Sequence, residues 1–178
     1  REEQDKFAFL SHQRASMATS EGRFRNEIVP VPVHRRDGTI LVENDEGPRA
    51  SASIANLSQL KEAFPPGLTV TAGNSSQISD GAAAVLWMDA DKARDLGLKP
   101  RARIVSDVVV GADPYYLLDG PIDATQAVLA KAGMEIGDLD LFEVNEAFAA
   151  VVLKFLKDSQ IDPDKLNVNG GAIALGHP

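Results

Sequence analysis

The 178-residue sequence predicts a layered α/β fold, in which helices alternate along the chain with the strands of a sheet. From about residue 100 onward, apolar or β-branched runs alternate with amphipathic segments in the order strand, helix, strand, helix, strand. Residues 82–88 form a continuous apolar run, which is typical of a strand buried on both faces. A hydrophobic content of 44% and a charged content of 25% are those of a globular domain.

The first 78 residues are more irregular and indicate an excursion inserted into such a sheet. Residues 2–20 predict a helix, because apolar side chains such as Phe7 and Leu10 recur at helical spacing and no glycine or proline occurs before Gly22. No internal repeat or low-complexity tract is visible in the chain.

The stretch that follows predicts a hairpin and a short helix. Residues 27–33 contain two prolines and therefore predict an edge or irregular strand. Asp37-Gly38 is a turn signal that predicts a hairpin with residues 39–42. Residues 54–64 then predict a short helix that ends at Pro65-Pro66-Gly67.

Local end signals define the helices of the second half. Gly97 and Gly133 each follow a helical segment directly, and Pro121 stands at the first position of another. Asp89 or Asp91 is available as a cap. We therefore expect helices over residues 89–96, 121–132 and 146–157, and strands over residues 82–88, 103–110, 139–144 and 167–169.

Composition argues against several functional classes. The 18 basic and 26 acidic residues give a net charge of −8, which does not suit a nucleic-acid surface. No run of about 18 apolar residues predicts a membrane span, and the first residues form neither a signal nor a transit peptide. The chain has no cysteine, which excludes disulfides and thiolate metal sites. We expect a cytoplasmic protein without a metal, a membrane or a nucleic-acid partner.

The stretch Asn145-Glu-Ala-Phe-Ala149 follows a predicted strand and opens a predicted helix. One interpretation is helix capping, because Asn is a leading N-cap residue and Glu146 in the first turn suits the helix dipole. The other is a functional site, because loops at strand ends of α/β sheets bind ligands. A fixed amide there can hold a water or an oxyanion. The two interpretations are compatible, and both stay open at this point.

The last stretch contains the pair Gly170-Gly171 and ends in Gly176-His177-Pro178. Ordering glycines is entropically costly, and Pro178 favours an extended His177. Such restraints indicate an imidazole held in one pose, which can activate a nucleophile or stabilise an oxyanion. Because an acyl-transfer site of this kind needs a nucleophile and the chain has no cysteine, we expect a fragment that ends at its own active site.

Three stretches, in this order and at this spacing, resemble the thiolases, the acetyl-CoA or 3-ketoacyl-CoA acyltransferases. They are Thr71-Ala-Gly-Asn-Ser-Ser76 with Asp80-Gly-Ala-Ala-Ala84, then Asn145–Ala149, then Asn167–Pro178. The likeness also runs through the first five residues and through Gly22–Pro30, so it covers the whole chain.

The resemblance implies a five-layered αβαβα sandwich, thiolase-like and incomplete in this chain. Residues 1–78 would be the later part of an inserted loop domain. Residues 79–99 would close the first α/β half, and residues 100–178 would begin the second.

The resemblance also implies roles for five residues. In thiolases a cysteine takes the acyl group from an acyl-CoA and passes it to a second acceptor. His177 would activate this nucleophile and contribute to the oxyanion hole for the thioester oxygen, and Asn145 would hold the water that supplies the other donor. Phe148 would line the acyl pocket, Ser76 would meet the pantetheine arm of CoA, and Arg49 would lie against its adenine nucleotide.

The same likeness implies that CoA is a substrate or product rather than a permanently bound cofactor, and that the full-length protein is a homodimer or homotetramer. Residues 1–178 alone would be inert, because the segments that carry both family cysteines are missing. A non-catalytic CoA- or lipid-binding relative is the alternative, and the intact Asn-Glu-Ala-Phe stretch favours the enzyme. A ketoacyl synthase ranks third, because those enzymes lack this stretch. Degradative cleavage in fatty-acid β-oxidation and biosynthetic condensation both stay open.

Overall fold

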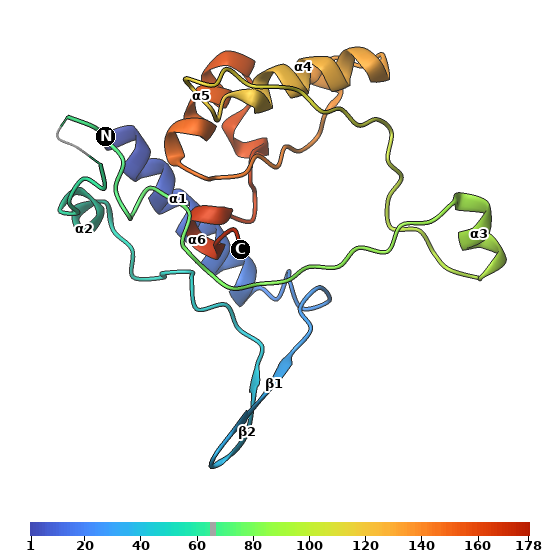
Figure 1. The fold of residues 1–178 in the computed structure, drawn as a ribbon, viewed down its shortest axis with the longest axis horizontal. Coiled ribbons are helices and arrows are strands. Elements are labelled where there is room, and N and C mark those ends of the chain that lie inside the picture. Colours follow the sequence, from blue (N-terminus) through green and yellow to red (C-terminus); the bar gives the residue numbers. More distant parts are fainter. Residues whose placement is uncertain (65–66) are drawn as a thin grey trace.

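The computed structural model describes residues 1–64 and 67–178 (Figure 1). Its elements are α1 (Glu2–Ser20), β1 (Val31–Arg35), β2 (Gly38–Val42), α2 (Ile54–Ser58), α3 (Ala90–Asp95), α4 (Gly120–Ala132), α5 (Ala149–Ser159) and α6 (Ala172–Leu175), with 3-10 turns at Ile136–Asp138 and Pro163–Lys165. The long helix α1 packs against α2, α5 and α6, and α4 packs against α5. None of the described helices has the length and apolar character that crossing a membrane requires.

The hydrophobic core lies where α5 meets α1 and α6. Phe7 of α1, Val152 and Phe155 of α5 and Ile173 of α6 are all buried there. The ring of Phe142 packs on that of Phe155 with 6.3 Å between the centroids. Helical spacing places Val152 and Phe155 on one face of α5, so burial of that face fixes the helix against α1.

Three predicted helices are confirmed, each with the expected end signals. α1 spans the predicted range. At α3, the Asp89 side chain accepts hydrogen bonds from the backbone N–H groups of Asp91 and Lys92. At α4, Pro121 lies in the first turn, and Gly133 ends the helix with φ of 67°, a left-handed conformation that glycine adopts without strain.

The N-terminal excursion contains the predicted hairpin and short helix. β1 and β2 are antiparallel, with a register from Val31 opposite Val42 to Arg35 opposite Gly38, and both strands are exposed. The resulting ribbon projects from the rest of the chain (Figure 1). β1 begins four residues later than predicted. α2 ends at Ser58, well before residue 64, and the predicted stop at Pro65-Pro66 lies outside the described residues.

The capping interpretation of Asn145 and Glu146 is wrong. α5 begins at Ala149 with Phe148 at the N-cap position, so neither residue caps the helix or lies in its first turn. The reason is that the Glu146 carboxylate bonds to groups far away in the sequence, and these bonds hold the preceding backbone in an extended path.

The predicted strands at residues 82–88 and 103–110 are not formed, which corrects the sequence analysis. Both segments are irregular and connect α3 to the rest of the chain (Figure 1). Their apolar side chains are exposed; Leu86 is 80% and Val109 96% accessible. A strand needs a neighbouring backbone for its N–H and C=O groups, and no described segment pairs with either run.

The last two predicted strands are reduced to one parallel bridge between Phe142 and Leu166. The Phe142 N–H donates to the Lys165 carbonyl at 2.9 Å, and the Phe142 carbonyl accepts from the Asn167 N–H at 2.9 Å. Because α5 connects the two sides, this is a minimal β-α-β crossover. The predicted order of strand, helix and strand is therefore right for this stretch, while the predicted strand lengths are wrong.

Candidate functional site

Glu146 is a fully buried carboxylate at the point where the Asn145–Ala149 stretch meets the glycine loop and α1. Its Oε2 atom accepts hydrogen bonds from the Ser11 hydroxyl at 2.6 Å and from the Ile173 N–H at 3.1 Å. Its Oε1 atom accepts one from Asn167 Nδ2 at 2.9 Å. Three donors compensate the carboxylate for its lost hydration, so this buried charge ties three segments together.

Gly171 is needed for space beside this carboxylate. A Cβ atom on Gly171 would lie 2.6 Å from Glu146 Oε1 and 2.8 Å from Oε2, well inside van der Waals contact. The Gly171 N–H also donates to the Ser11 hydroxyl at 3.2 Å. Since the φ of Gly171 is extended, at −156°, the requirement is close approach and not an unusual backbone conformation.

The side chain of Asn167 makes the hydrogen bonds that a neighbouring strand would otherwise make with the backbone of Val144. The backbone of Asn167 takes a left-handed φ of 45°, which ends the parallel bridge. Its side chain then pairs with the backbone of Val144: Oδ1 accepts from the Val144 N–H at 2.8 Å, and Nδ2 donates to the Val144 carbonyl at 2.8 Å. The amide therefore fixes the chain immediately before Asn145.

The loop after Thr71 lies alongside the Asn145–Ala149 stretch and is hydrogen-bonded to it. Ser75 and Phe148 form an antiparallel bridge, and the Ser76 N–H donates to the Ala147 carbonyl at 2.9 Å. The Phe148 ring lies edge-on to Phe64, with 6.5 Å between centroids. Ser76 and Phe148, both singled out from the sequence, are thus held on adjacent segments of the chain.

A buried polar cluster anchors this loop to α1. Asn74 Nδ2 donates to Asp5 Oδ1 at 3.0 Å, and Asn74 Oδ1 accepts from the Thr71 N–H at 2.8 Å. The second Asp5 oxygen pairs with Arg1 Nε at 2.7 Å. Asp5, Thr71 and Asn74 are at most 1% exposed, so an unmade bond here would leave a buried polar group unpaired.

His177 follows a tightly enclosed glycine. Gly176 has φ of 87°, and a Cβ atom on it would collide with the Ser79 hydroxyl. A Cβ atom on Gly81 would lie 2.7 Å from Pro178 Cγ. Residues 77–81 therefore run beside the Gly-His-Pro stretch. The His177 side chain is exposed and forms no hydrogen bond with the residues that the structure describes.

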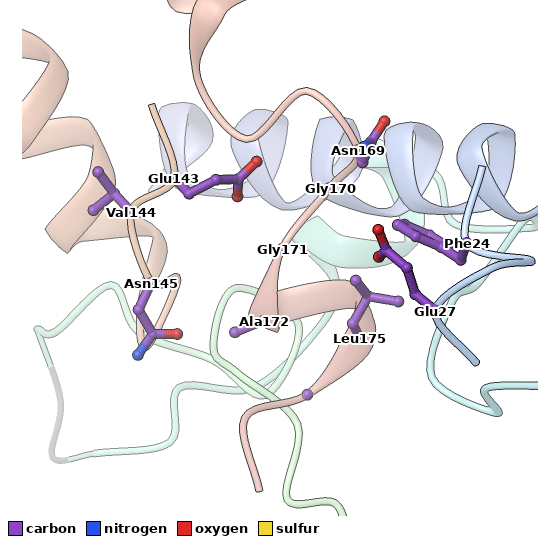
Figure 2. Close-up of a pocket in the computed structure, with 11 residues that line it drawn as sticks. Phe24, Glu27, Glu143, Val144, Asn145, Asn169, Gly170, Gly171, Ala172 and Leu175 are labelled. Atoms are coloured by element: carbon purple, nitrogen blue, oxygen red, sulfur yellow. The ribbon is translucent and has the colours of Figure 1, made fainter. Parts of the chain in front are cut away.

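A cavity of about 440 Å³ opens between these segments (Figure 2). Glu143 and Asn145 form one wall, and Phe24, Glu27 and Leu175 form the other, with the glycine loop between them. Gly176 also lines the cavity, whereas the side chain of the next residue along the chain does not. Asn145 and the backbone of the glycine loop thus face one space.

Burial in this cavity raises the pKa of the Glu143 carboxyl, and the negative charge of Glu146 raises it further. The Glu143 side chain still reaches solvent, so the effect on stability is small.

Arg49 stands apart from the cavity. Its side chain is exposed, while its backbone N–H donates to His12 Nδ1 at 3.2 Å. His12, to which we assign no role from the sequence, is only 4% exposed. Burial lowers the pKa of His12, and the positive charge of Arg49 lowers it further. An Nδ1 atom that accepts a hydrogen bond belongs to a neutral imidazole, so this contact depends on the uncharged form.

The structure places Ser76 beside Ala147 and Phe148, which follow Asn145 in the chain. The backbone leading into His177 lines the same cavity as Asn145, and Ser76 and Phe148 do not line this cavity. Sequence reasoning assigned no role to Ser11, Asn74 or Asn167. Asn74 and Asn167 lie within the stretches that resemble the family, whereas Ser11 has no signal beyond a polar side chain on the buried face of a helix. Within the described ranges, no group of three or more His, Asp or Glu side chains is arranged to hold a metal ion.

Comparison with known proteins identifies the class. The family model described as "Thiolase, N-terminal domain" matches residues 1–91, and that described as "Thiolase, C-terminal domain" matches residues 98–178. The chain therefore belongs to the thiolase family, as the sequence resemblance predicts.

Curated relatives carry the more specific name. The chain is 54% identical over 184 residues to the 3-ketoacyl-CoA thiolase of Cronobacter sakazakii, covering 100% of this chain and 47% of that protein. It is 51% identical over 183 residues to the 3-ketoacyl-CoA thiolase of Vibrio parahaemolyticus, with the same two coverages. The chain thus spans about half the length of the curated relatives it matches.

Solved structures confirm the thiolase-like fold. The acetyl-CoA acetyltransferase of Bacillus anthracis superposes with a TM-score of 0.97 at 43% identity, covering all of this chain and 45% of that one. Human mitochondrial 3-ketoacyl-CoA thiolase superposes with a TM-score of 0.91 at 40% identity, again over 100% of this chain and 45% of the other. The irregular segments around α3 are included in this agreement, because the superposition covers the whole chain.

Proposed function

We propose that the protein is an acyl-CoA C-acyltransferase that cleaves 3-ketoacyl-CoA with CoA or runs the reverse condensation. One observation supports this most strongly. Asn145 and the glycine loop that carries His177 lie on opposite sides of α5 in the sequence, and the buried Glu146 network holds them around one cavity. Relatives named 3-ketoacyl-CoA thiolase match the chain over its full length.

In this proposal Asn145 and His177 stabilise the negative charge that develops on a substrate oxygen during the reaction. A thiolate attacks the C3 carbonyl of the substrate, and the bond between C2 and C3 breaks with its electron pair going to C2. The C2 fragment leaves as the enolate of acetyl-CoA and takes a proton from an acid, which would be the second family cysteine outside residues 1–178. The acyl group stays on sulfur until the thiol of CoA removes it. His177 would take the proton of the nucleophilic thiol and would donate to the thioester oxygen of the substrate, on which negative charge develops as the bond between C2 and C3 breaks. Asn145 would hold the water that is the second donor to this oxygen. Fixed donors of this kind are typically worth about 3 kcal/mol of barrier each.

The nucleophile would come from outside residues 1–178, which contain no cysteine. We therefore expect this stretch alone to be inert. In the same proposal, residues 1–78 belong to an inserted loop domain, residues 79–99 close one α/β half and residues 100–178 begin the next. The extended apolar segments on either side of α3 would then pair with strands of the remaining protein.

CoA would lie along three of the predicted residues. Ser76, whose N–H is bonded to Ala147, would meet the pantetheine arm, and the exposed Arg49 would face the adenine nucleotide. Phe148 would bound the acyl chain, which its edge contact with Phe64 supports as part of an apolar wall. CoA is then a substrate or product. The homodimeric or homotetrameric state and the cytoplasmic location stay predictions.

The test is a CoA-dependent cleavage assay on the protein expressed from its complete gene. Acetoacetyl-CoA and a longer 3-ketoacyl-CoA are each incubated with CoA, and the shortened acyl-CoA and acetyl-CoA are quantified by mass spectrometry. We expect equal amounts of the shortened acyl-CoA and acetyl-CoA from the longer substrate, and two molecules of acetyl-CoA from each molecule of acetoacetyl-CoA. Saturable CoA binding without any product would favour the non-catalytic binding protein, and absence of both binding and product would contradict either reading.

A further inference from the structure

The carboxamide of Gln77 joins two loops that lie far apart in the sequence. Its Nε2 atom donates to the carbonyl of Gly47 at 3.0 Å and to those of Ile173 and Ala174 at 3.1 and 2.8 Å. These acceptors are 30, 96 and 97 residues away. An amide nitrogen has two hydrogens, so one serves Gly47 and the other is shared by the two carbonyls of α6.

The same three segments are in close backbone contact. A Cβ atom on Gly47 would collide with the Ala174 carbonyl oxygen and would lie 3.1 Å from Gln77 Nε2. Further along, Gly176 is enclosed by Ser79, and Gly81 by Pro178. Contacts at every second residue show that residues 77–81 run parallel to residues 174–178, with Gln77 at the start of this alignment.

Each loop leads directly to a proposed functional residue. Gly47 is two positions before Arg49, and Ala174 is three positions before His177. The His177 side chain makes no hydrogen bond with described residues, so the position of its ring depends on the backbone before it. Apart from hydrogen bonds within α6 and its ends, the bonds that hold this backbone come from Glu146, Ser11 and Gln77, and of these only Gln77 reaches as far along α6 as Ala174.

We propose that Gln77 is a positioning residue that holds the loop of Arg49 and the loop of His177 in one fixed arrangement. The CoA-contact region and the catalytic imidazole then keep a fixed position relative to each other. This inference rests on the proposed function for its kinetic consequence. Displacement of a catalytic group by about 1 Å can cost on the order of 100-fold in rate, so a partly buried amide well away from the chemistry can matter.

The test compares Gln77→Met and Gln77→Glu with Gln13→Met in the protein expressed from its complete gene. Met keeps the length of the side chain without donors, and Glu presents a carboxylate to three carbonyl oxygens. Gln13 lies on the exposed face of α1 and serves as the matched control. The readouts are kcat, the KM for CoA, and hydrogen exchange of the peptides that contain residues 46–49 and 171–177.

We expect both Gln77 variants to lower kcat by about 10- to 100-fold and to raise the KM for CoA several-fold. Exchange should become faster in both peptides while α1 keeps its protection, and Gln13→Met should change none of these values. Turnover within twofold of the wild type, or unchanged exchange in both peptides, would overturn the proposal. So would equal loss of protection throughout the chain. If the wild type shows no cleavage, the proposed function fails, and the exchange data alone decide whether Gln77 holds the two loops.

Discussion

The Glu146 carboxylate accepts a 2.6 Å hydrogen bond from the hydroxyl of Ser11, a residue 135 positions earlier in the chain. Ser11 in turn accepts from the Gly171 N–H, so one hydroxyl links α1, the Asn145–Ala149 stretch and the glycine loop. The proposed site is therefore assembled on α1, which contributes no residue to the proposed chemistry.

Gly171→Ala should destabilise the protein by about 2 kcal/mol, because the added methyl group meets both Glu146 oxygens and the network cannot move without losing hydrogen bonds. Urea unfolding, followed by fluorescence of the single tryptophan, measures the loss. Gly137→Ala is the matched control, since no atom lies within 4 Å of its Cβ position. Equal stabilities of the two variants would show that the carboxylate does not fix the loop.

The lowered pKa of His12 makes stability fall on acidification. The unfolded chain titrates near the ordinary value of 6.5, and burial keeps the folded group neutral to lower pH. Between these two values the unfolded state binds more protons, so its population rises as pH falls. The contribution of His12 is complete above pH 6.5 and is lost as pH falls towards the folded pKa. His12→Asn should flatten this slope between pH 7.5 and 5.

The control for that experiment is His34→Asn, because His34 is exposed on the hairpin. Free energies of unfolding at four or five pH values provide the comparison. A slope that His12→Asn leaves unchanged would mean that the neutral imidazole contributes nothing to folding.

Glu143→Gln should raise stability at pH 7 by a small amount. The folded pKa of Glu143 lies above its ordinary value of 4.5, because burial and the Glu146 charge disfavour the ionised form. Stability is therefore lost as pH rises from 4.5 through the folded pKa, and an uncharged amide avoids this loss. Thermal melts at pH 4 and pH 7 test the sign: the gain should be present at pH 7 and absent at pH 4. A loss at pH 7 would contradict it.

The elements that sequence predicts well are those whose signals are local. α3 and α4 have an aspartate cap and a left-handed glycine, respectively, within a few residues of their ends. The Asn145 and His177 stretches can be proposed from the sequence because their motifs are contiguous. The Glu146 network cannot, since Ser11 gives no sign in the sequence that it will meet a carboxylate 135 residues later.

Strands were predicted less well for the same reason. The run at residues 82–88 has the composition of a buried strand, but a ladder also requires a neighbour, and none of the described segments supplies one. At Asn167 a side chain takes over the pairing that a longer strand would have made with Val144. This side-chain pairing depends on the left-handed backbone of Asn167, which the amino-acid composition does not reveal.

The measurement that tests the account most directly is kcat for 3-ketoacyl-CoA cleavage by the protein expressed from its complete gene, compared with Asn145→Ala, His177→Ala and the double variant. Each single substitution should lower kcat by about 100- to 1000-fold, and the double variant should lose less than the product of the two, because both groups serve one oxyanion. His34→Ala is the control. If the single variants keep wild-type kcat, these residues do not form the site and the central claim is wrong.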